Sequence, residues 1–169
     1  DVDCHGTDPN FFLDLLRVLK ELGGFLPSVR WVYILNRNGI SGLHLVGLLG
    51  PGGVHALDRH LLACVELGVR LRVPKIAIHG FLDGRDSAPT LGAEVVRTLL
   101  LDMRRIAGDR VDIATLTGRY YGMDRDHRWE RTRAAYDAIA HGVGIAVEHP
   151  VLAVQADYAY ARQSIAATV

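Results

Sequence analysis

Three apolar segments of strand length recur along this chain, and each is followed by a polar loop and then by a helix-like segment. The apolar segments are LHLVGLL at 43–49, KIAIHGF at 75–81 and VDIATLT at 111–117. Strands that are apolar on both faces are typical of a parallel sheet covered by helices. The pattern therefore predicts an α/β fold, specifically a three-layer α/β/α sandwich with a mainly parallel central sheet.

Helices are predicted where apolar residues recur every three to four positions. The expected helices cover 10–22, 56–69, a segment from Ser87 to Gly108, 129–140 and 150–167. Ser87 is expected to cap the third of these, with Pro89 in its first turn, and a pair of glycines ends the first. Residues 31–35 have the composition of a strand, but the turn-like residues after them leave their assignment open.

Length and charge limit the classes of protein to which the chain can belong. Its 169 residues fit a single domain spanning 1–169, and Lys+Arg equals Asp+Glu at 19 each. Nucleic-acid and membrane-surface partners need a large field of one sign, which this balance does not supply. Cys4 and Cys64 lack CxxC spacing, which favours a reducing, cytoplasmic location, although a single disulfide between them stays open.

The polar loops GPGGVH at 50–55, LDGRD at 82–86 and GRYYGMDRD at 118–126 each follow a predicted strand. In parallel sheets, ligands bind beyond the carboxyl ends of the strands. All three loops should therefore meet at one edge of the sheet and form a single site. The third loop is rich in arginine and aspartate, a combination in which carboxylates can hold guanidinium groups while leaving donors free for a small anion.

Five residues of these loops are candidates for contact with such an anion. Arg119 and Arg125 suit phosphate and carboxylate groups, and Arg85 could clamp an acid group. Asp86 could accept a hydrogen bond from a substrate hydroxyl or act as acid and base, and His55 could donate to an oxyanion. Structural alternatives stay open for each loop: a hydrogen-bonded histidine at a helix start, an Asp-Gly turn with a surface ion pair, and arginines that pair only with neighbouring aspartates.

Other polar residues are interpreted as structural. Tyr120 and Tyr121 are taken as aromatic residues that anchor the third loop, and the strand residues His44 and His79 as hydrogen-bonded histidines. The arginines after the loop are expected to form a solvated helix face; these are Arg128, Arg131 and Arg133. 

No metal site is predicted. His55, Asp58 and His60 lie close in sequence, but the spacing of the two histidines puts them on different helix faces. The sequence also contains no HExxH, GxxxxGK[ST], GxGxxG or GxSxG motif. It therefore offers groups that can hold a substrate but no recognisable catalytic centre.

Three segments together resemble the cofactor-independent (2,3-bisphosphoglycerate-independent) phosphoglycerate mutases: LHLVGLLGPGGVH at 43–55, FLDGRDSAP at 81–89 and GRYYGMDRDHRWER at 118–131. VLAVQADYAYAR at 151–162 is a weaker match. In this family a phosphatase-like domain carries a serine nucleophile and two manganese ions, and an inserted phosphotransferase domain holds the substrate. The chain resembles the inserted domain. The resemblance implies interconversion of 3-phosphoglycerate and 2-phosphoglycerate in glycolysis and gluconeogenesis, with His55, Arg85, Asp86, Arg119 and Arg125 binding the substrate and Asp86 as the catalytic candidate that handles the hydroxyl proton.

The chain also departs from the family pattern. The family usually reads SDGGVHSH where this chain reads GPGGVHAL, which changes the polar residues beside His55. The serine-nucleophile segment, the clustered metal ligands and the FRPDR-like arginine motif are missing, so the chain is not expected to catalyse the reaction alone. Two alternatives therefore remain: a stand-alone module that binds a phospho-acid without turnover, and a diverged relative that acts on another phosphorylated or phosphonylated acid.

Overall fold

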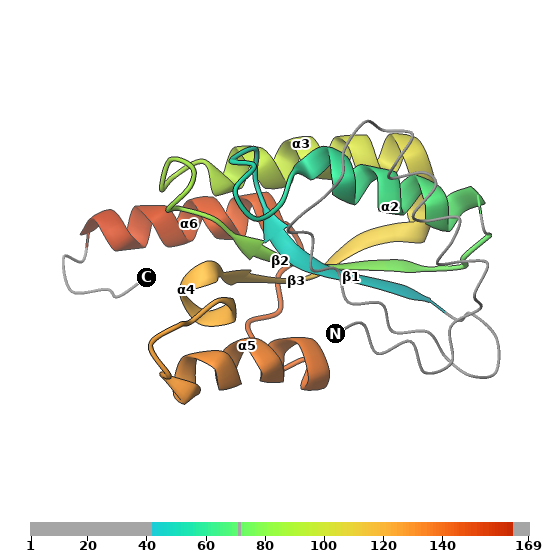
Figure 1. Ribbon diagram of the computed structural model, residues 1–169. Coiled ribbons are helices and arrows are strands. Elements are labelled where there is room, and N and C mark those ends of the chain that lie inside the picture. The colour runs from blue at the N-terminus through green and yellow to red at the C-terminus, as the bar shows by residue number, and fades with distance from the viewer. Residues whose placement is uncertain (1–41, 71, 164–169) are drawn as a thin grey trace.

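The computed structural model describes residues 42–70 and 72–163 (Figure 1). The predicted helix at 10–22, the open assignment at 31–35, Cys4 and the last residues of the predicted helix at 150–167 lie outside the described residues. The three strands that carry the predicted loops, and the helices between and after them, lie inside.

The described sheet has three parallel strands in the order β1-β2-β3. β1 spans Leu43–Leu49, β2 spans Ile76–Leu82 and β3 spans Val111–Gly118. The predicted parallel sheet is confirmed, and each strand boundary lies within one residue of the expectation. Between β2 and β3 the register shifts after Ile78, because β3 contains one residue more than β2 at this point. This bulge puts Thr115 opposite His79.

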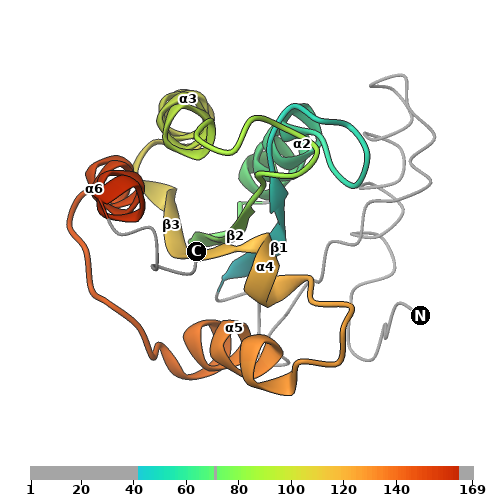
Figure 2. The ribbon, with the colours of Figure 1, turned by 90° about the vertical axis from the view of Figure 1, so that its left-hand side faces the viewer.

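Helices cover both faces of the sheet, which gives the predicted three layers. α2 (Asp58–Arg70), α3 (Gly92–Ala107) and α6 (Pro150–Gln163) lie on one side, and α5 (Trp129–His141) lies on the other (Figure 2). A single 3-10 turn, η1 (Gly108–Arg110), joins α3 to β3, and the short helix α4 (Arg119–Gly122) follows β3 directly. α5 buries only Ala135, so this layer contributes far fewer buried residues than α2 and α3.

Two predicted boundaries are wrong. Ser87 does not cap α3 and Pro89 is not in its first turn, because Ala88 to Leu91 form a turn in which the Leu91 N–H donates to the Ala88 carbonyl. Proline at the second position of such a turn is as favourable as proline at a helix start, so the sequence signal was ambiguous. The arginine-rich segment was predicted to be a loop throughout, but it begins with the single helical turn of α4.

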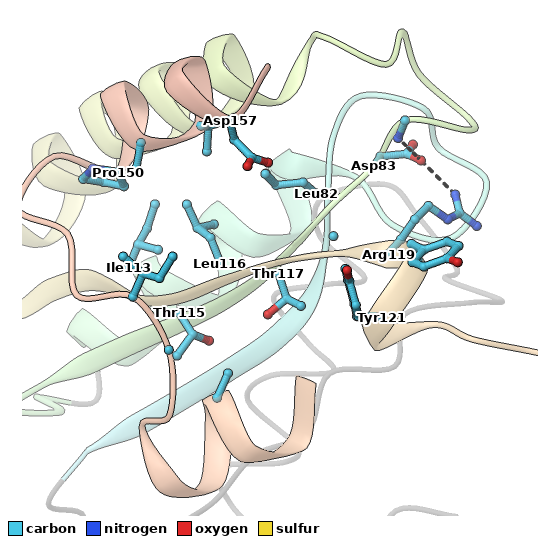
Figure 3. Close-up of a pocket in the computed structure, with 18 of the residues that line it drawn as sticks. Leu82, Asp83, Ile113, Thr115, Leu116, Thr117, Arg119, Tyr121, Pro150 and Asp157 are labelled. Atoms are coloured by element: carbon cyan, nitrogen blue, oxygen red, sulfur yellow. Dashed lines mark hydrogen bonds and ion pairs between the residues drawn. The ribbon is translucent and has the colours of Figure 1, made fainter. Parts of the chain in front are cut away.

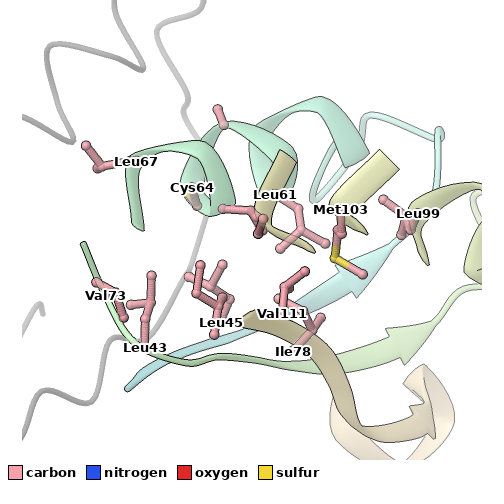
Figure 4. Close-up of a cluster of buried hydrophobic side chains, with 14 of the residues drawn as sticks. Leu43, Leu45, Leu61, Cys64, Leu67, Val73, Ile78, Leu99, Met103 and Val111 are labelled. Carbon is pink, nitrogen blue, oxygen red and sulfur yellow. The ribbon is translucent and has the colours of Figure 1, made fainter. Parts of the chain in front are cut away.

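The hydrophobic core lies between the sheet and helices α2 and α3 (Figure 4). Leu45 and Ile78 from the strands pack there with Leu61, Leu99 and Met103 from the helices, and all five are buried. Cys64 is also buried in this cluster. None of the helices in the described part of the chain is both long and apolar enough to cross a membrane. The core thus fixes the strands, and the strands in turn fix where the polar loops begin.

Candidate functional site

All three predicted loops begin at the carboxyl edge of the sheet, because the strands before them are parallel. An open cavity of about 1670 Å³ lies beside this edge and extends along β3 toward α5 and α6. His55, Arg85, Arg119 and Arg125 all line it. Figure 3 shows part of this lining, with side chains from β3 and α6 facing the space. The structure therefore brings four of the five predicted residues to one cavity, and the fifth, Asp86, lies against two of them.

Asp83 organises the loop after β2. Its side chain is only 3% exposed, and its Oδ1 accepts hydrogen bonds from the backbone N–H groups of Gly84, Arg85 and Asp86 at 2.7, 3.0 and 3.2 Å. Burial alone would raise the pKa of this carboxyl, but the Arg119 guanidinium and the three N–H groups together hold the pKa well below its usual range. Asp83 is therefore an anion at neutral pH, and it fixes the backbone of the LDGRD loop.

Arg119, the first residue of α4, joins the loops after β2 and β3. Its Nη1 donates to Asp83 Oδ1 at 2.8 Å, as the dashed line in Figure 3 shows, and to Asp86 Oδ2 at 2.6 Å. The side chain is 15% exposed. Burial acts to lower the pKa of this guanidinium, but the two carboxylates outweigh it and raise the pKa. Because a single nitrogen makes both bonds, Nε and Nη2 have no side-chain partner among residues 42–70 and 72–163 and can serve a ligand.

His55 lies next to this ion-pair network but does not start a helix, since α2 begins three residues later at Asp58. Its Nε2 is 3.7 Å from Asp86 Oδ2, which is beyond hydrogen-bond distance. The two groups attract each other only when the imidazole is protonated. Asp58 instead accepts a hydrogen bond from the Gly50 N–H at 2.8 Å, which ties the end of β1 to the start of α2.

A second aspartate organises the loop after α4. The Asp124 side chain is 2% exposed, and its Oδ2 accepts hydrogen bonds from the N–H groups of Asp126 and Arg128 at 3.1 and 2.8 Å. Arg131 from α5 donates to Oδ1 at 3.0 Å, and its guanidinium carbon lies 3.8 Å from the centroid of the Tyr120 ring. Burial would raise the pKa of the Asp124 carboxyl, but the N–H groups and Arg131 lower it.

These contacts correct one prediction and confirm others. Arg131 was expected on a solvated face, but it is only 20% exposed because it pairs with Asp124 and stacks on Tyr120. Arg133 is solvated as expected, with its side chain 72% exposed beside Asp137. Tyr120 anchors the loop through the same stacking contact and through an edge-on contact with Tyr121.

Arg85 and Arg125 differ from the two paired arginines. Both side chains are exposed and line the cavity, and in the described part of the chain neither makes a side-chain hydrogen bond or ion pair with another residue. Each lies within a loop segment whose backbone is fixed by a buried aspartate. These two guanidinium groups are therefore presented to the cavity with their donors available.

The strand histidines form a chain of hydrogen bonds across the sheet, which confirms their structural interpretation. His44 Nδ1 lies 2.9 Å from His79 Nε2, and His79 Nδ1 lies 2.9 Å from Thr115 Oγ1. Burial, and then the charge of His44, lower the pKa of His79. Because one of the facing nitrogens must act as an acceptor, at least one of the two rings is neutral in this arrangement.

Sequence reasoning missed Asp83, Asp124 and Arg131 as individual members of the site. It anticipated that aspartates would hold guanidinium groups, but it did not identify which pairs. A local signal exists: an aspartate followed by a glycine or by polar residues often accepts hydrogen bonds from the backbone one to four residues later. Within the described ranges, no group of three or more His, Cys, Asp or Glu residues could hold a metal ion.

A parallel sheet with charged loops around a cavity at its carboxyl edge defines an α/β domain of the kind in which ligands bind beyond the ends of the strands. Residues 29–167 match the family described as BPG-independent PGAM N-terminus (iPGM_N), and the chain belongs to this family. This finding confirms the resemblance that the three sequence segments indicated.

Full-length relatives carry the name 2,3-bisphosphoglycerate-independent phosphoglycerate mutase. The protein from Thermomicrobium roseum is 48% identical over 141 residues, which are 82% of this chain and 26% of the relative. The protein from Lachnoclostridium phytofermentans is 40% identical over 152 residues, which are 88% of this chain and 29% of the relative. A phosphoglycerate mutase from Leishmania mexicana, crystallised at low cobalt concentration, superposes with a TM-score of 0.60 at 27% identity and covers 76% of this chain and 24% of its own. The chain thus spans about a quarter of the length of these relatives.

Proposed function

We propose that this chain holds phosphoglycerate within an enzyme that interconverts 3-phosphoglycerate and 2-phosphoglycerate in glycolysis and gluconeogenesis. The observation that carries the proposal is the pair Arg85 and Arg125, which line one cavity without side-chain partners among the described residues. Both substrates carry a phosphate and a carboxylate, the two groups that guanidinium donors bind best. The family to which the chain belongs supports the same substrates.

The remaining site residues have complementary roles in this proposal. Arg119 offers its Nε and Nη2 to the same anion, while its Nη1 stays with the two aspartates. The Oδ2 of Asp86 accepts a hydrogen bond from Arg119, which leaves Oδ1 for the substrate. Oδ1 can accept the proton of a substrate hydroxyl while the oxygen of that hydroxyl bonds to the phosphoryl group. His55, beside Asp86, can donate to a phosphate oxygen.

The catalytic centre of this enzyme would lie outside the described residues, which contain no candidate metal cluster. We infer that a phosphatase-like domain, within the three quarters of the relatives' length that this chain does not span, supplies a serine nucleophile and two manganese ions. Manganese there would stabilise the charge on the transferring phosphoryl group. We also place the enzyme in the cytoplasm, the compartment that the cysteine pattern favours.

Calorimetric titration of 3-phosphoglycerate into the 169-residue chain tests the proposal. Arg85→Ala and Arg125→Ala should each weaken binding by roughly 10- to 150-fold, because a hydrogen bond to a charged group contributes about 1.5 to 3 kcal/mol. Arg97→Ala is the matched control, since this arginine pairs with Glu94 on α3 away from the cavity. Equal affinity of all three variants and the unmodified chain would refute the assigned site.

The same titration with other ligands tests the substrate class. We expect 3-phosphoglycerate and 2-phosphoglycerate to bind more tightly than inorganic phosphate or glycerate, because only the phospho-acids engage both types of anionic group at once. Tighter binding of a different phosphorylated or phosphonylated acid would instead favour a diverged relative, the alternative that the GPGGVHAL segment leaves open.

A further inference from the structure

Two loops at the site are held by the same arrangement of groups. In each, an almost fully buried aspartate accepts hydrogen bonds from backbone N–H groups of the residues after it and from an arginine of a different element. Asp83 does this with Arg119, which lies 36 positions away, and Asp124 does it with Arg131 of α5. An arginine with no described partner lies inside each loop, at Arg85 and at Arg125. All four arginines line the cavity. Arg119 and Arg131 hold the loops through buried aspartates, whereas the side chains of Arg85 and Arg125 have no partner in the described part of the chain.

We propose that Asp124 is a positioning residue for the substrate-binding side chain of Arg125, and that Asp83 has the same role for Arg85. The inference rests on the function proposed above, because it concerns how that site is held. The hydrogen bonds around Asp124 support this role. Its Oδ2 accepts hydrogen bonds from the backbone N–H groups of Asp126 and Arg128, which follow Arg125 in the chain, whereas Asp124 itself precedes it. The carboxylate and the bonded N–H groups therefore bracket Arg125 and fix the backbone from which its side chain extends.

Arg131 completes the arrangement from α5. It neutralises the buried Asp124 carboxylate and stacks on Tyr120, so it connects α4, the loop and α5 in one cluster. This connection matters because α5 buries little apolar surface of its own. When the loop is already ordered, ligand binding does not have to supply the entropic cost of ordering it. In catalysis, where geometry is decisive, misplacing a group by about 1 Å can reduce the rate on the order of a hundredfold.

The experiment compares Asp124→Ala and Asp124→Asn with Asp102→Asn, a control that removes the same charge from the exposed Arg105 pair on α3. Titration of 3-phosphoglycerate should show about tenfold or greater loss for Asp124→Ala, and no change for the control. Asp124→Asn keeps one oxygen for the backbone N–H groups but loses the pair with Arg131, so it should show a smaller loss. Circular dichroism shows whether each variant is folded. If Asp124→Ala does not fold, the affinity of Asp124→Asn tests the positioning role.

A double-mutant cycle separates positioning from a general structural role. If Asp124 acts through Arg125, Asp124→Ala should weaken binding no further in a chain that already carries Arg125→Ala. A full additional tenfold loss in that background would overturn the inference, as would unchanged affinity of the folded single variants.

Backbone amide exchange without ligand distinguishes a failure of this inference from a failure of the proposed function. The amides of Asp126 and Arg128 should be protected in the unmodified chain and exchange at least tenfold faster in Asp124→Ala. If the unmodified chain does not bind 3-phosphoglycerate, the proposed function fails for this chain, while the exchange result still decides whether Asp124 fixes the loop. Unprotected amides in the unmodified chain would overturn the positioning role.

Discussion

Replacing Arg119 with alanine tests whether the ion-pair network at the sheet edge stabilises the fold. The substitution leaves Asp83 and Asp86 without their shared cation, and Asp83 is too buried for water to replace it fully. Two charge-assisted hydrogen bonds contribute roughly 3 to 6 kcal/mol together when fully desolvated. Because Arg119 is 15% exposed and water can reach Asp86, we expect a loss of about 2 to 4 kcal/mol in the free energy of unfolding at pH 7.

The loss should depend on pH in a defined direction. The folded-state pKa of Asp83 is depressed, so its stabilising contribution is present above the unfolded pKa of about 3.9 and is lost as the pH falls through the folded value. Without Arg119 the folded pKa of Asp83 moves upward. The difference between the two proteins is therefore largest at neutral pH and narrows once the pH falls below the folded pKa of Asp83 in the variant.

Urea denaturation followed by circular dichroism at pH 7 and pH 3 measures both effects. Arg133→Ala is the matched control, because Arg133 forms an exposed ion pair on α5 that contributes roughly 0.3 to 0.5 kcal/mol. The reasoning is refuted if Arg119→Ala costs no more than this control at pH 7. It is also refuted if the cost is larger at pH 3 than at pH 7.

Three further predictions concern other parts of the fold. Gly80→Ala should lower the free energy of unfolding by about 1 to 3 kcal/mol in thermal melts, because the added Cβ would clash with Leu49 Cδ1 in the core; an unchanged melting temperature would contradict this packing. Trp129→Ala should change stability by less than about 0.5 kcal/mol, since the ring is 68% exposed, and a larger loss would show that α5 is held by contacts of this ring. The pKa of His79, followed by NMR, should lie below 6.5, so the neutral ring stabilises the fold above the unfolded pKa and stability falls as the pH drops through and below about 6.5; a pKa above 6.5 would refute the burial argument.

The sheet, and the edge from which its charged loops begin, were predictable because they depend on the order of strands, loops and helices along the chain. The run at 43–49 is apolar at every position except His44, so it could be recognised as a strand without reference to any partner. Once three such strands are parallel, the loops after them meet at one edge whatever their side chains do. The sequence alone therefore assigns His55, Arg85 and Arg125 to one site, and all three line the cavity.

The start of α3 and the pairing of the arginines were not predictable in this way. Ser87 and Pro89 fit a helix start and a turn equally well, and the structure has the turn. The Arg119 partner of Asp83 lies 36 positions away, so the sequence around either residue does not reveal the pair. Arg131 has the sequence surroundings of a solvated helix residue, and only its contacts with Asp124 and Tyr120 show otherwise. Contacts of this kind depend on the tertiary structure, so local composition cannot reveal them.

The division of the arginines also bears on which ligand fits this edge. Arg119 and Arg131 are largely compensated by Asp83, Asp86 and Asp124, whereas Arg85 and Arg125 have no compensating side chain among the described residues. An anion with a single charged group could engage one of the two uncompensated guanidinium groups well and would leave the other to solvent. A molecule with a phosphate at one position and a carboxylate at another can satisfy both, and its affinity gains from the joint engagement. Under the proposed function, the ligand is therefore selected by the arginines that the fold leaves unpaired, and not by the total number of arginines in the sequence.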